Sequence, residues 1–231
     1  MQQFLERMCT PFLQRLKKNA YENLSVDDYT PDTRGWVNNG FDTCLEIIYE
    51  KNKNNYGLVV FEVGSWKGAS AIRIADKFQG HLDSIVCIDT WLGAPEFYTQ
   101  FLGDETRSVN QLNGWPQVFY IFTKNMKKLG YSDYVAPFPI SSVQGAEVMK
   151  YHKIKADFIY LDAAHEYDAV LADMEAYREL LKPGGVLWGD DYHDTDACAF
   201  PGVAKAVKFF VKKYGLTLEV HGYNWIVSGF A

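Results

Sequence analysis

Short apolar runs that alternate with segments of helical periodicity restrict this chain of 231 residues to few folds. Five such runs occur along it, at residues 58–63, 84–88, 134–138, 157–161 and 186–189. Each run is mostly apolar rather than alternating, which is typical of strands that are buried on both faces. Helical spacing follows most of them, over residues 70–78, 143–151, 170–181 and 203–211. This alternation predicts an α/β fold with a doubly wound, mostly parallel sheet.

The last part of the chain departs from this alternation. Strands are expected around residues 216–221 and 223–228, and Gly222 between them leaves no room for a helical crossover. These two strands should therefore pair as a C-terminal antiparallel hairpin. The clearest helix before them has an apolar stripe that ends at Leu181, and the Pro-Gly-Gly of residues 183–185 should stop it.

The first part of the chain is expected to be a helical N-terminal extension. Apolar residues have helical spacing at Phe4, Leu5, Met8, Phe12 and Leu16. Pro11 marks a break or a new first turn, a second helix should cover residues 40–51, and residues 51–57 form a loop. The sequence thus divides into residues 1–56, serving as a lid or an oligomer contact, and a ligand-binding domain of residues 57–231.

Charge and composition exclude several functional classes. A net charge of −6 argues against a nucleic-acid or anionic membrane surface, which needs clustered Lys and Arg. No stretch has the roughly 20 apolar residues of a membrane span, and the N-terminus lacks the apolar core of a secretory signal. The scattered cysteines form neither a zinc pattern nor a disulfide framework, which favours a reducing, cytoplasmic setting; they are Cys9, Cys44, Cys87 and Cys198.

Acidic residues stand at the ends of four of the five predicted parallel strands. They are Glu62, Asp89, Asp162 and the pair Asp190 and Asp191. Ligands of open α/β sheets bind beyond the carboxyl ends of the strands, where these side chains should meet. Carboxylates brought this close repel one another unless a cation lies between them. For any one of these aspartates alone, capping a helix or turn would be an equally good explanation.

The loop after the first strand is rich in glycine. It reads EVGSWKGAS over residues 62–70, with Gly64 and Gly68 allowing a tight turn before a helix. It lacks the G-x-G-x-x-G pattern of dinucleotide-binding proteins, which disfavours a nicotinamide oxidoreductase. Asp89 lies roughly 20 residues beyond it, where an acid can accept hydrogen bonds from both hydroxyls of a ribose. Together the loop and the acid favour an adenosine-containing ligand.

Three runs carry a resemblance to a known family. VVFEVGSWKGASAIRIAD resembles motif I of catechol O-methyltransferase-like enzymes, and SIVCIDTWLGAP resembles the ribose-binding segment of macrocin and related sugar O-methyltransferases and cephalosporin-hydroxylase-like proteins. FIYLDAAHEYDAVLADMEAYRELLKPGGVLWGDDY resembles the metal-binding half of that group. The resemblance covers about residues 57–192. It implies a class I S-adenosylmethionine-dependent methyltransferase with a Rossmann-like fold.

The resemblance also implies which residues hold the cofactor. The methionine part would lie against Glu62, Gly64, Ser65 and Gly68. Asp89 would hold the ribose, Thr90 and Trp91 would lie beside the adenine, and Ser142 would contact its edge. Trp66 and Asp162 are placed beside the cofactor as well, although Trp66 and Trp91 could simply pack.

The metal ligands implied by the resemblance are Asp162, Asp190 and Asp191. Their oxygen donors suit Mg²⁺, or Mn²⁺, which would lower the pKa of a bound acceptor hydroxyl. Some sugar O-methyltransferases have a second Asp two residues beyond the first ligand, whereas this chain has Ala164 there. The expected catalytic residues are therefore Asp162 and His165, with His165 or a hydroxide held by the metal taking the proton.

The acceptor is left open by the sequence. A metal favours adjacent hydroxyls, so a sugar, a glycan precursor, a polyketide glycoside or a catechol-like phenol all fit a small-molecule acceptor. Residues 34–36 and 98–115 could cover it, pack on the surface or contact a second copy in a homo-oligomer. Two alternatives are a metal-dependent hydroxylase-like or other non-methylating enzyme on the same scaffold, and a non-catalytic nucleoside-binding protein.

Overall fold

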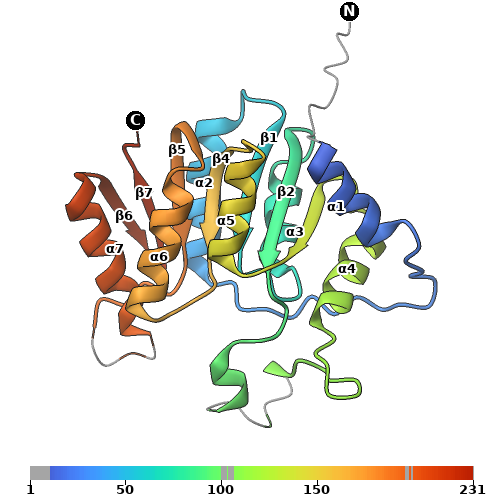
Figure 1. Cartoon of the computed structure of the whole chain (residues 1–231). Helices are drawn as coiled ribbons and strands as arrows, with labels where there is room; N and C mark the ends of the chain where they lie inside the picture. The colour runs from blue at the N-terminus through green and yellow to red at the C-terminus, as the bar shows by residue number, and fades with distance from the viewer. Residues whose placement is uncertain (1–10, 100–102, 104–106, 196–197, 199, 231) are drawn as a thin grey trace, which may run out of the picture.

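A seven-stranded sheet forms the centre of the part of the chain that the structure, a computed structural model, describes: residues 11–99, 103, 107–195, 198 and 200–230. The strand order is β3-β2-β1-β4-β5-β7-β6 (Figure 1). Successive strands are added on one side of β1 up to β3 and on its other side from β4 onwards, so the strand order reverses between β1 and β4. The strands are β1 (Leu58–Val63), β2 (Leu82–Asp89), β3 (Val135–Pro139), β4 (Ala156–Leu161), β5 (Leu181–Gly189), β6 (Thr217–His221) and β7 (Asn224–Ser228). The first five strands are parallel, so the predicted α/β fold with a mostly parallel sheet is confirmed.

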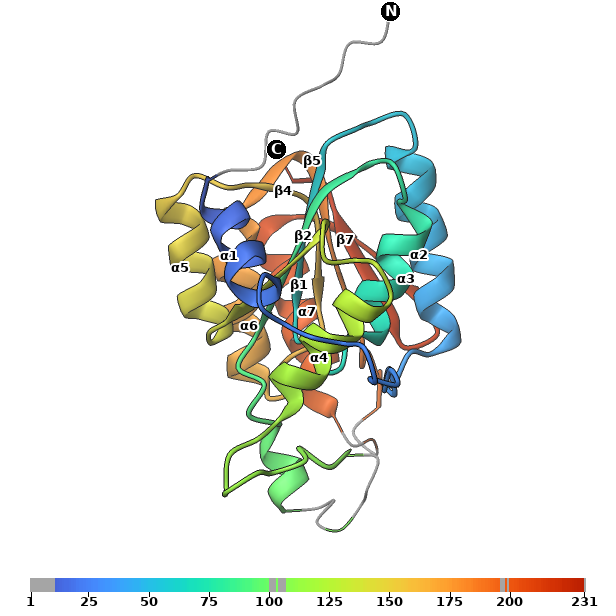
Figure 2. The ribbon, with the colours of Figure 1, turned by 90° about the vertical axis from the view of Figure 1, so that its right-hand side faces the viewer.

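Helices cover both faces of the sheet, as Figure 2 shows from its edge. One face carries α2 (Asn39–Asn52), α3 (Ala69–Lys77) and α4 (Val118–Lys128), and the other carries α5 (Ser142–Tyr151), α6 (Tyr167–Arg178) and α7 (Pro201–Tyr214). Helix α1 (Pro11–Tyr21) packs on β3 at the edge of the sheet. The central strands are buried on both sides, which explains their continuous apolar runs. None of the helices within the described ranges is long and apolar enough to cross a membrane.

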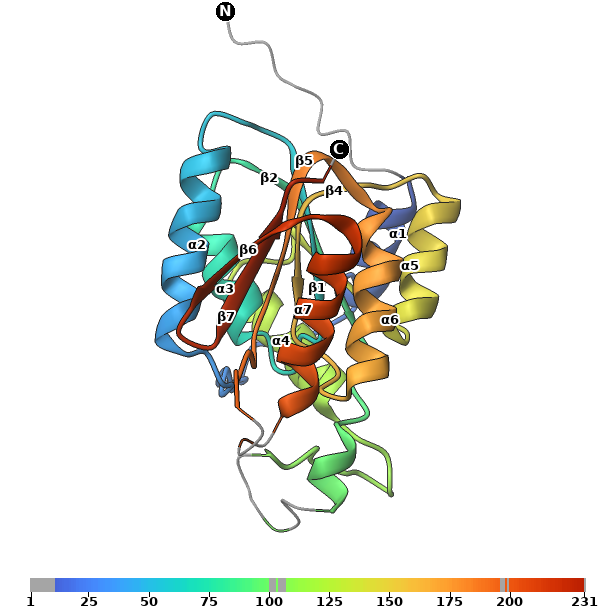
Figure 3. The same cartoon turned by 90° about the vertical axis from the view of Figure 1, so that its left-hand side faces the viewer.

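The C-terminal hairpin is confirmed. β6 and β7 pair antiparallel, and β7 also pairs antiparallel with β5, so the second strand of the hairpin inserts between β5 and β6. Figure 3 shows this edge of the sheet with α2 on one side and α7 on the other.

The predicted end of α6 is wrong. The helix stops at Arg178, and Leu181 already begins β5, where it pairs with Ala156 of β4. The register of this pairing shifts before Val186, so residues 183–185 form an irregularity within the strand instead of a helix stop. Pairing with β4 therefore outweighs the helical spacing of Leu181. No element was predicted for residues 92–130, which contain the short 3₁₀ helix η1 (Pro95–Tyr98) and α4.

The N-terminal extension is partly described. Helix α1 starts at Pro11, while Phe4, Leu5 and Met8 lie outside the described residues. Helix α2 matches the prediction and buries Phe41, Leu45 and Ile48 with side chains of the sheet. Residues 39–52 thus contribute to the core on one face of the sheet. The function of the extension as a lid or oligomer contact stays a prediction.

The carboxyl ends of β1 and β4 approach each other closely at Gly64. The amide of Asp162 donates to the carbonyl of Val63 at 2.8 Å, and the chain then passes Gly64 with a φ of 85°. A Cβ atom on Gly64 would lie 1.9 Å from the carbonyl oxygen of Asp162. Only glycine fits this position, because both the backbone conformation and the space exclude a side chain.

Replacing Gly64 by alanine should therefore destabilise the fold. We expect Gly64→Ala to lower the free energy of unfolding by about 2–5 kcal/mol, from overpacking together with a left-handed backbone. The control is Gly80→Ala, because Gly80 has a similar φ of 82° but no atom within 4 Å of the place that an added methyl group would take. That variant should lose only about 1–2 kcal/mol in urea unfolding. Equal losses would contradict the close approach of β1 and β4.

Candidate functional site

The carboxylate of Asp89, at the end of β2, holds the loop between β1 and α3 through hydrogen bonds. Asp89 accepts hydrogen bonds from the amides of Ser65 and Trp66 through Oδ2, both at 2.9 Å, and from the amide of Trp91 through Oδ1 at 2.7 Å. Trp66 and Trp91 both have positive φ, so the carboxylate holds two unusual turns in place. Burial raises the pKa of Asp89, and the amide hydrogen bonds limit that rise.

Polar atoms without partners lie directly beneath this loop. Glu62 is fully buried, and neither of its carboxylate oxygens, nor the buried Oγ of Ser65, has a hydrogen-bond partner among the described residues. Burial also raises the pKa of Glu62, and the neighbouring side chains of Ser65, Ser70 and Cys87 limit that rise although none of them makes a hydrogen bond of ordinary geometry with the carboxylate. Buried polar groups in folded proteins are normally hydrogen-bonded, so this arrangement fits a polar ligand such as an amino-acid group.

The aromatic residues of the predicted cofactor site differ in burial. Trp91 is almost fully buried, packs against Phe119 and Phe122 of α4, and donates through Nε1 to the carbonyl of Trp66 at 2.7 Å. The ring of Trp66 instead lies 4.9 Å from that of Phe97 in η1. Trp91 therefore supports the loop from within the core.

The remaining predicted cofactor contacts lie further along the sheet edge. Thr90 is exposed, and its Oγ1 accepts a hydrogen bond from the amide of Leu92 at 3.3 Å. Ser142, at the start of α5, donates through Oγ to Asp173 of α6. Asp173 was not predicted from the sequence; it is nearly fully buried, and burial raises its pKa to about 6. Its position within the buried stripe of α6, beside Val170 and Met174, is the sequence feature that could have identified it.

Asp162, His165 and Asp191 converge beyond the ends of β4 and β5. One ligand atom from each lies within 4.8 Å of the others, a spacing at which a metal ion can be held. Asp191 has a φ of 59°, which is a left-handed backbone conformation. Because the chain turns here, the side chains of Asp190 and Asp191 need not point to opposite sides as they would within a strand. His165 thus takes a place in the cluster beside two of the three predicted ligands.

Asp190, the third predicted ligand, is engaged differently. Its Oδ1 accepts hydrogen bonds from Nδ2 of Asn38 at 2.7 Å, Nδ2 of Asn224 at 2.9 Å and the amide of Asp191 at 2.8 Å. The side-chain amides of two asparagines therefore stabilise the negative charge of Asp190, which offsets part of its repulsion by the other acids. Neither asparagine was singled out in the sequence, because each is far from Asp190 along the chain.

His165 bridges the cluster and the segment after β2. Its Nε2 lies 3.1 Å from Oδ2 of Asp191, its Nδ1 lies 3.4 Å from Oε1 of Glu96 in η1, and its ring stacks on Phe200 at 3.9 Å. Burial lowers the pKa of His165, but the hydrogen bond and charge of Asp191 and the charge of Asp162 outweigh it, raising the pKa to about 9. Burial and mutual repulsion also raise the pKa values of Asp162 and Asp190. Glu96 was missed because residues 92–130 carry no recognisable sequence pattern.

A cavity opens beside this cluster, between the ends of β4 and β5 and the helices α6 and α7. Its lining comprises Leu161, Asp162, Ala163, Ala164, His165, Val170, Asp173, Asp190, Asp191, Val203 and Trp225. The cavity combines acidic groups with apolar walls, and its volume of about 20 Å³ is enough for one water molecule.

Comparisons with known proteins agree with this architecture. The profile of a family described as a methyltransferase domain matches residues 61–192, which is more than half of the chain. A search of curated protein sequences finds no match. Among solved structures, a proposed caffeoyl-CoA O-methyltransferase from Staphylococcus aureus is 15% identical with a TM-score of 0.58, covering 94% of this chain and 98% of that one.

Two further structures show how widely the fold is shared. An O-methyltransferase from Bacillus cereus in complex with S-adenosylhomocysteine (SAH) is 14% identical with a TM-score of 0.55, covering 96% of this chain and 92% of that one. A proposed rRNA methylase from Clostridium thermocellum is 12% identical with the same TM-score of 0.55, covering 84% and 98%. Such identities show the fold alone, so the exclusion of nucleic acid stays a prediction. The family profile shows that the chain belongs to the methyltransferase-domain family, and the solved structures show that it shares the Rossmann-like fold of these O-methyltransferases.

Proposed function

We propose that this methyltransferase is an O-methyltransferase that uses Mg²⁺ or Mn²⁺ and acts on a hydroxyl of a small molecule or sugar. The observation that carries the proposal is the cluster of Asp162, His165 and Asp191. It lies next to the glycine loop, because Gly64 packs on the backbone of Asp162. A methyl donor in that loop and an acceptor at the cluster would therefore be neighbours.

The cofactor is expected to occupy the loop with its methionine part over Gly64, Ser65 and Gly68. The unpartnered oxygens of Glu62 and Ser65 fit the charged groups of an amino acid. A ribose hydroxyl would join the hydrogen bonds that Asp89 already accepts from the loop. Binding would then use the loop in the conformation that Asp89 maintains.

The metal is expected between Asp162, Asp191 and His165, with Asp190 alongside. Carboxylate oxygens suit Mg²⁺, and an added imidazole suits Mn²⁺. When bound, such an ion lowers the pKa of a hydroxyl on the acceptor. His165 directs Nε2 towards the cluster, as a ligand or as the acceptor of the hydroxyl proton, while Glu96 fixes the ring through Nδ1.

Methyl transfer from a sulfonium is an in-line displacement, so the protein must hold an oxygen nucleophile behind the methyl group. Ala163 and Ala164 line the cavity beside the cluster, so an acceptor hydroxyl would approach the cluster past small side chains. The family assignment favours this reaction over a hydroxylase-like activity or a non-catalytic role in nucleoside binding. Within the proposal, two adjacent hydroxyls on a sugar or a catechol-like ring fit best, because both can face one ion.

A methyl-transfer assay tests the proposal directly. Purified protein is incubated with methyl-labelled S-adenosylmethionine and a panel of sugars and catechols, with Mg²⁺ or with excess chelator. We expect label to enter an acceptor hydroxyl and the rate to fall on the order of 100-fold in chelator, since a metal supplies several kcal/mol of stabilisation. An unchanged rate in chelator would refute the metal requirement, and label found only on nitrogen or carbon would refute O-methylation.

The variant Asp191→Asn separates metal binding from cofactor binding. Loss of a group outside the metal's direct ligands typically costs about 10–100-fold in affinity, so loss of a ligand should weaken Mg²⁺ binding at least as much. The affinity for S-adenosylmethionine, measured by calorimetry without metal, should stay within about twofold. The matched control is Asp194→Asn, because Asp194 is exposed and pairs with Lys208 outside the cluster. Equal metal affinity in the two variants would contradict the ligand assignment.

The pH dependence of stability provides a further test. His165 has a folded pKa of about 9 against an ordinary 6.5, so it stabilises the fold fully below pH 6.5 and loses that contribution as the pH rises through 9. The raised pKa values of Asp162 and Asp190 act in the same direction, that of Asp190 between its ordinary 3.8 and about 6, and that of Asp162 over a range that extends well above 3.8. In the presence of excess chelator, the free energy of unfolding measured with urea should therefore fall between pH 6.5 and pH 9. Mg²⁺ should reduce this loss of stability because the ion replaces the bound protons. The variant His165→Gln should make the stability depend less on pH. A stability that rises with pH would contradict this account.

A further inference from the structure

We propose that the crossing segment, residues 29–38, positions the cofactor loop, residues 64–68, through the ion pair of Asp32 with Lys67 and the side-chain amide of Asn125. This inference rests on the proposed cofactor site. The crossing segment is the last part of the connection between α1 and α2, and it runs along the carboxyl ends of the strands (Figure 1). Asp32 and Lys67 are positioning residues in this proposal, since their contacts are with each other and with backbone.

Lys67 is buried although it belongs to a loop. Its side chain is 0% exposed, and its Nζ lies 2.9 Å from Oδ2 of Asp32. A lysine is almost never fully buried unless its charge is paired, because removal of an ammonium from water is costly. The cofactor loop therefore keeps this inward conformation only while the crossing segment supplies the carboxylate.

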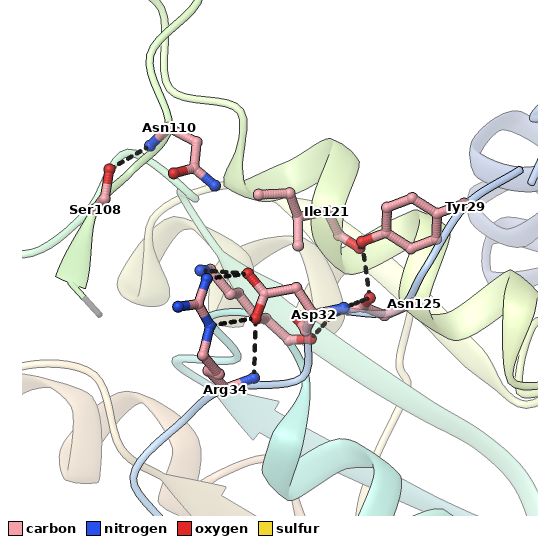
Figure 4. A network of polar contacts seen from close by, with 8 residues as sticks. Tyr29, Asp32, Arg34, Ser108, Asn110, Ile121 and Asn125 are labelled. Atoms are coloured by element: carbon pink, nitrogen blue, oxygen red, sulfur yellow. Dashed lines mark hydrogen bonds and ion pairs between the residues drawn. The ribbon is translucent and has the colours of Figure 1, made fainter. Parts of the chain in front are cut away.

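Asn125 of α4 joins the same two segments through their backbones. Its Nδ2 donates to the carbonyls of Asp32 at 2.6 Å and Lys67 at 2.8 Å. Its Oδ1 accepts from the amide of Asp32 at 3.0 Å and from the hydroxyl of Tyr29 at 2.9 Å. Both donor positions and both acceptor positions of this fully buried amide are thus used. Figure 4 shows its contacts with Tyr29 and Asp32. A side chain satisfied in this way fixes the cofactor loop relative to the crossing segment.

Arg34 fixes the carboxylate of Asp32 in turn. Its Nε and Nη2 donate to the two oxygens of Asp32 at 2.7 and 2.9 Å, a bidentate arrangement that sets the plane of the carboxylate (Figure 4). The hydrogen bond with Arg34, followed by Lys67, holds the pKa of Asp32 well below its usual range. Asp32 is therefore charged at neutral pH and available to Lys67.

The part of the crossing segment that follows this ion pair also touches the site. A Cβ on Gly35 would lie 2.9 Å from Cβ of Ala69, where the cofactor loop enters α3. The ring of Trp36 lies 6.2 Å from that of Trp66. Asn38, at the end of the segment, donates to Asp190. The segment thus follows the edge of the site from the cofactor loop to the acidic cluster.

These contacts would preorganise the cofactor loop. Gly64 and Gly68 at its ends both have positive φ, so neither end has a side chain that restricts the backbone. Asp89 holds the amides of Ser65 and Trp66 from one side, and Asn125 with Asp32 holds Lys67 from the other. A loop that is already ordered loses less conformational entropy when it binds a ligand.

The test compares the double variant Asp32→Asn/Lys67→Met with the wild type. Removal of both charges avoids leaving one of them buried and unpaired. We expect a folded protein whose calorimetric Kd for S-adenosylmethionine rises on the order of tenfold, within the usual range of coupling between sites. The control, Lys150→Gln/Glu179→Gln, removes an exposed ion pair between α5 and α6 and should leave the Kd unchanged. A folded double variant with the wild-type Kd would overturn the inference.

Hydrogen exchange provides a readout that a purely structural contact would not change, and it needs no variant. If the crossing segment positions the loop, cofactor binding must in return order the segment, since coupling is reciprocal. Saturating S-adenosylmethionine should slow amide exchange at residues 29–38 of the wild type, and the double variant should lose this protection. Cofactor binding without slower exchange there would overturn the inference alone. Absence of cofactor binding to the wild type would instead refute the proposed cofactor site.

Discussion

Repulsion between the carboxylates of Asp162, Asp190 and Asp191 is the constraint on which the rest of the site depends. Parallel strands place their carboxyl ends at one edge, so acids at the ends of β4 and β5 meet in a partly buried space. Without bound metal, His165 supplies the opposing charge to Asp162 and Asp191, and asparagine amides supply donors to Asp190. Each of these partners comes from a different part of the chain, so the repulsion is balanced only in the complete fold.

Asp190 shows how the site and the fold depend on each other. Its Oδ1 binds Asn38, which caps α2, and Asn224, which begins β7. Asn224 also accepts a hydrogen bond from Nε1 of Trp188 in β5, and the carbonyl of Asp190 accepts one from Nε1 of Trp225. These hydrogen bonds fix the N-terminal extension and the C-terminal hairpin against β5. The extension is therefore attached, through Asn38, to the same edge of the sheet as the acids.

The sequence predicted those features that depend on local pattern. Buried strands, the hairpin around Gly222 and the tight turn at Gly64 each follow from a few neighbouring residues, and all were found. The end of α6 was wrong because pairing with β4 overrides the helical spacing of Leu181. Glu96 and Asn125 could not be predicted, since each matters only through residues far away in sequence, such as His165 or Lys67.

The position of His165 links the metal proposal to the acceptor. Ala164 offers no side chain that could take a proton, so within the proposal this task falls to His165 in its neutral form, which a bound metal ion would favour over the protonated form with a pKa of about 9. The orientation of its ring depends on Glu96 at Nδ1, and Glu96 belongs to η1, next to Phe97, which packs on Trp66 and Trp36. The short helix η1 would thus set both the orientation of the His165 ring and the position of the aromatic side chains beside the cofactor loop. In the proposal, motifs at strand ends carry the cofactor and metal chemistry, whereas η1 lies outside them, which is why the acceptor could not be inferred from those motifs.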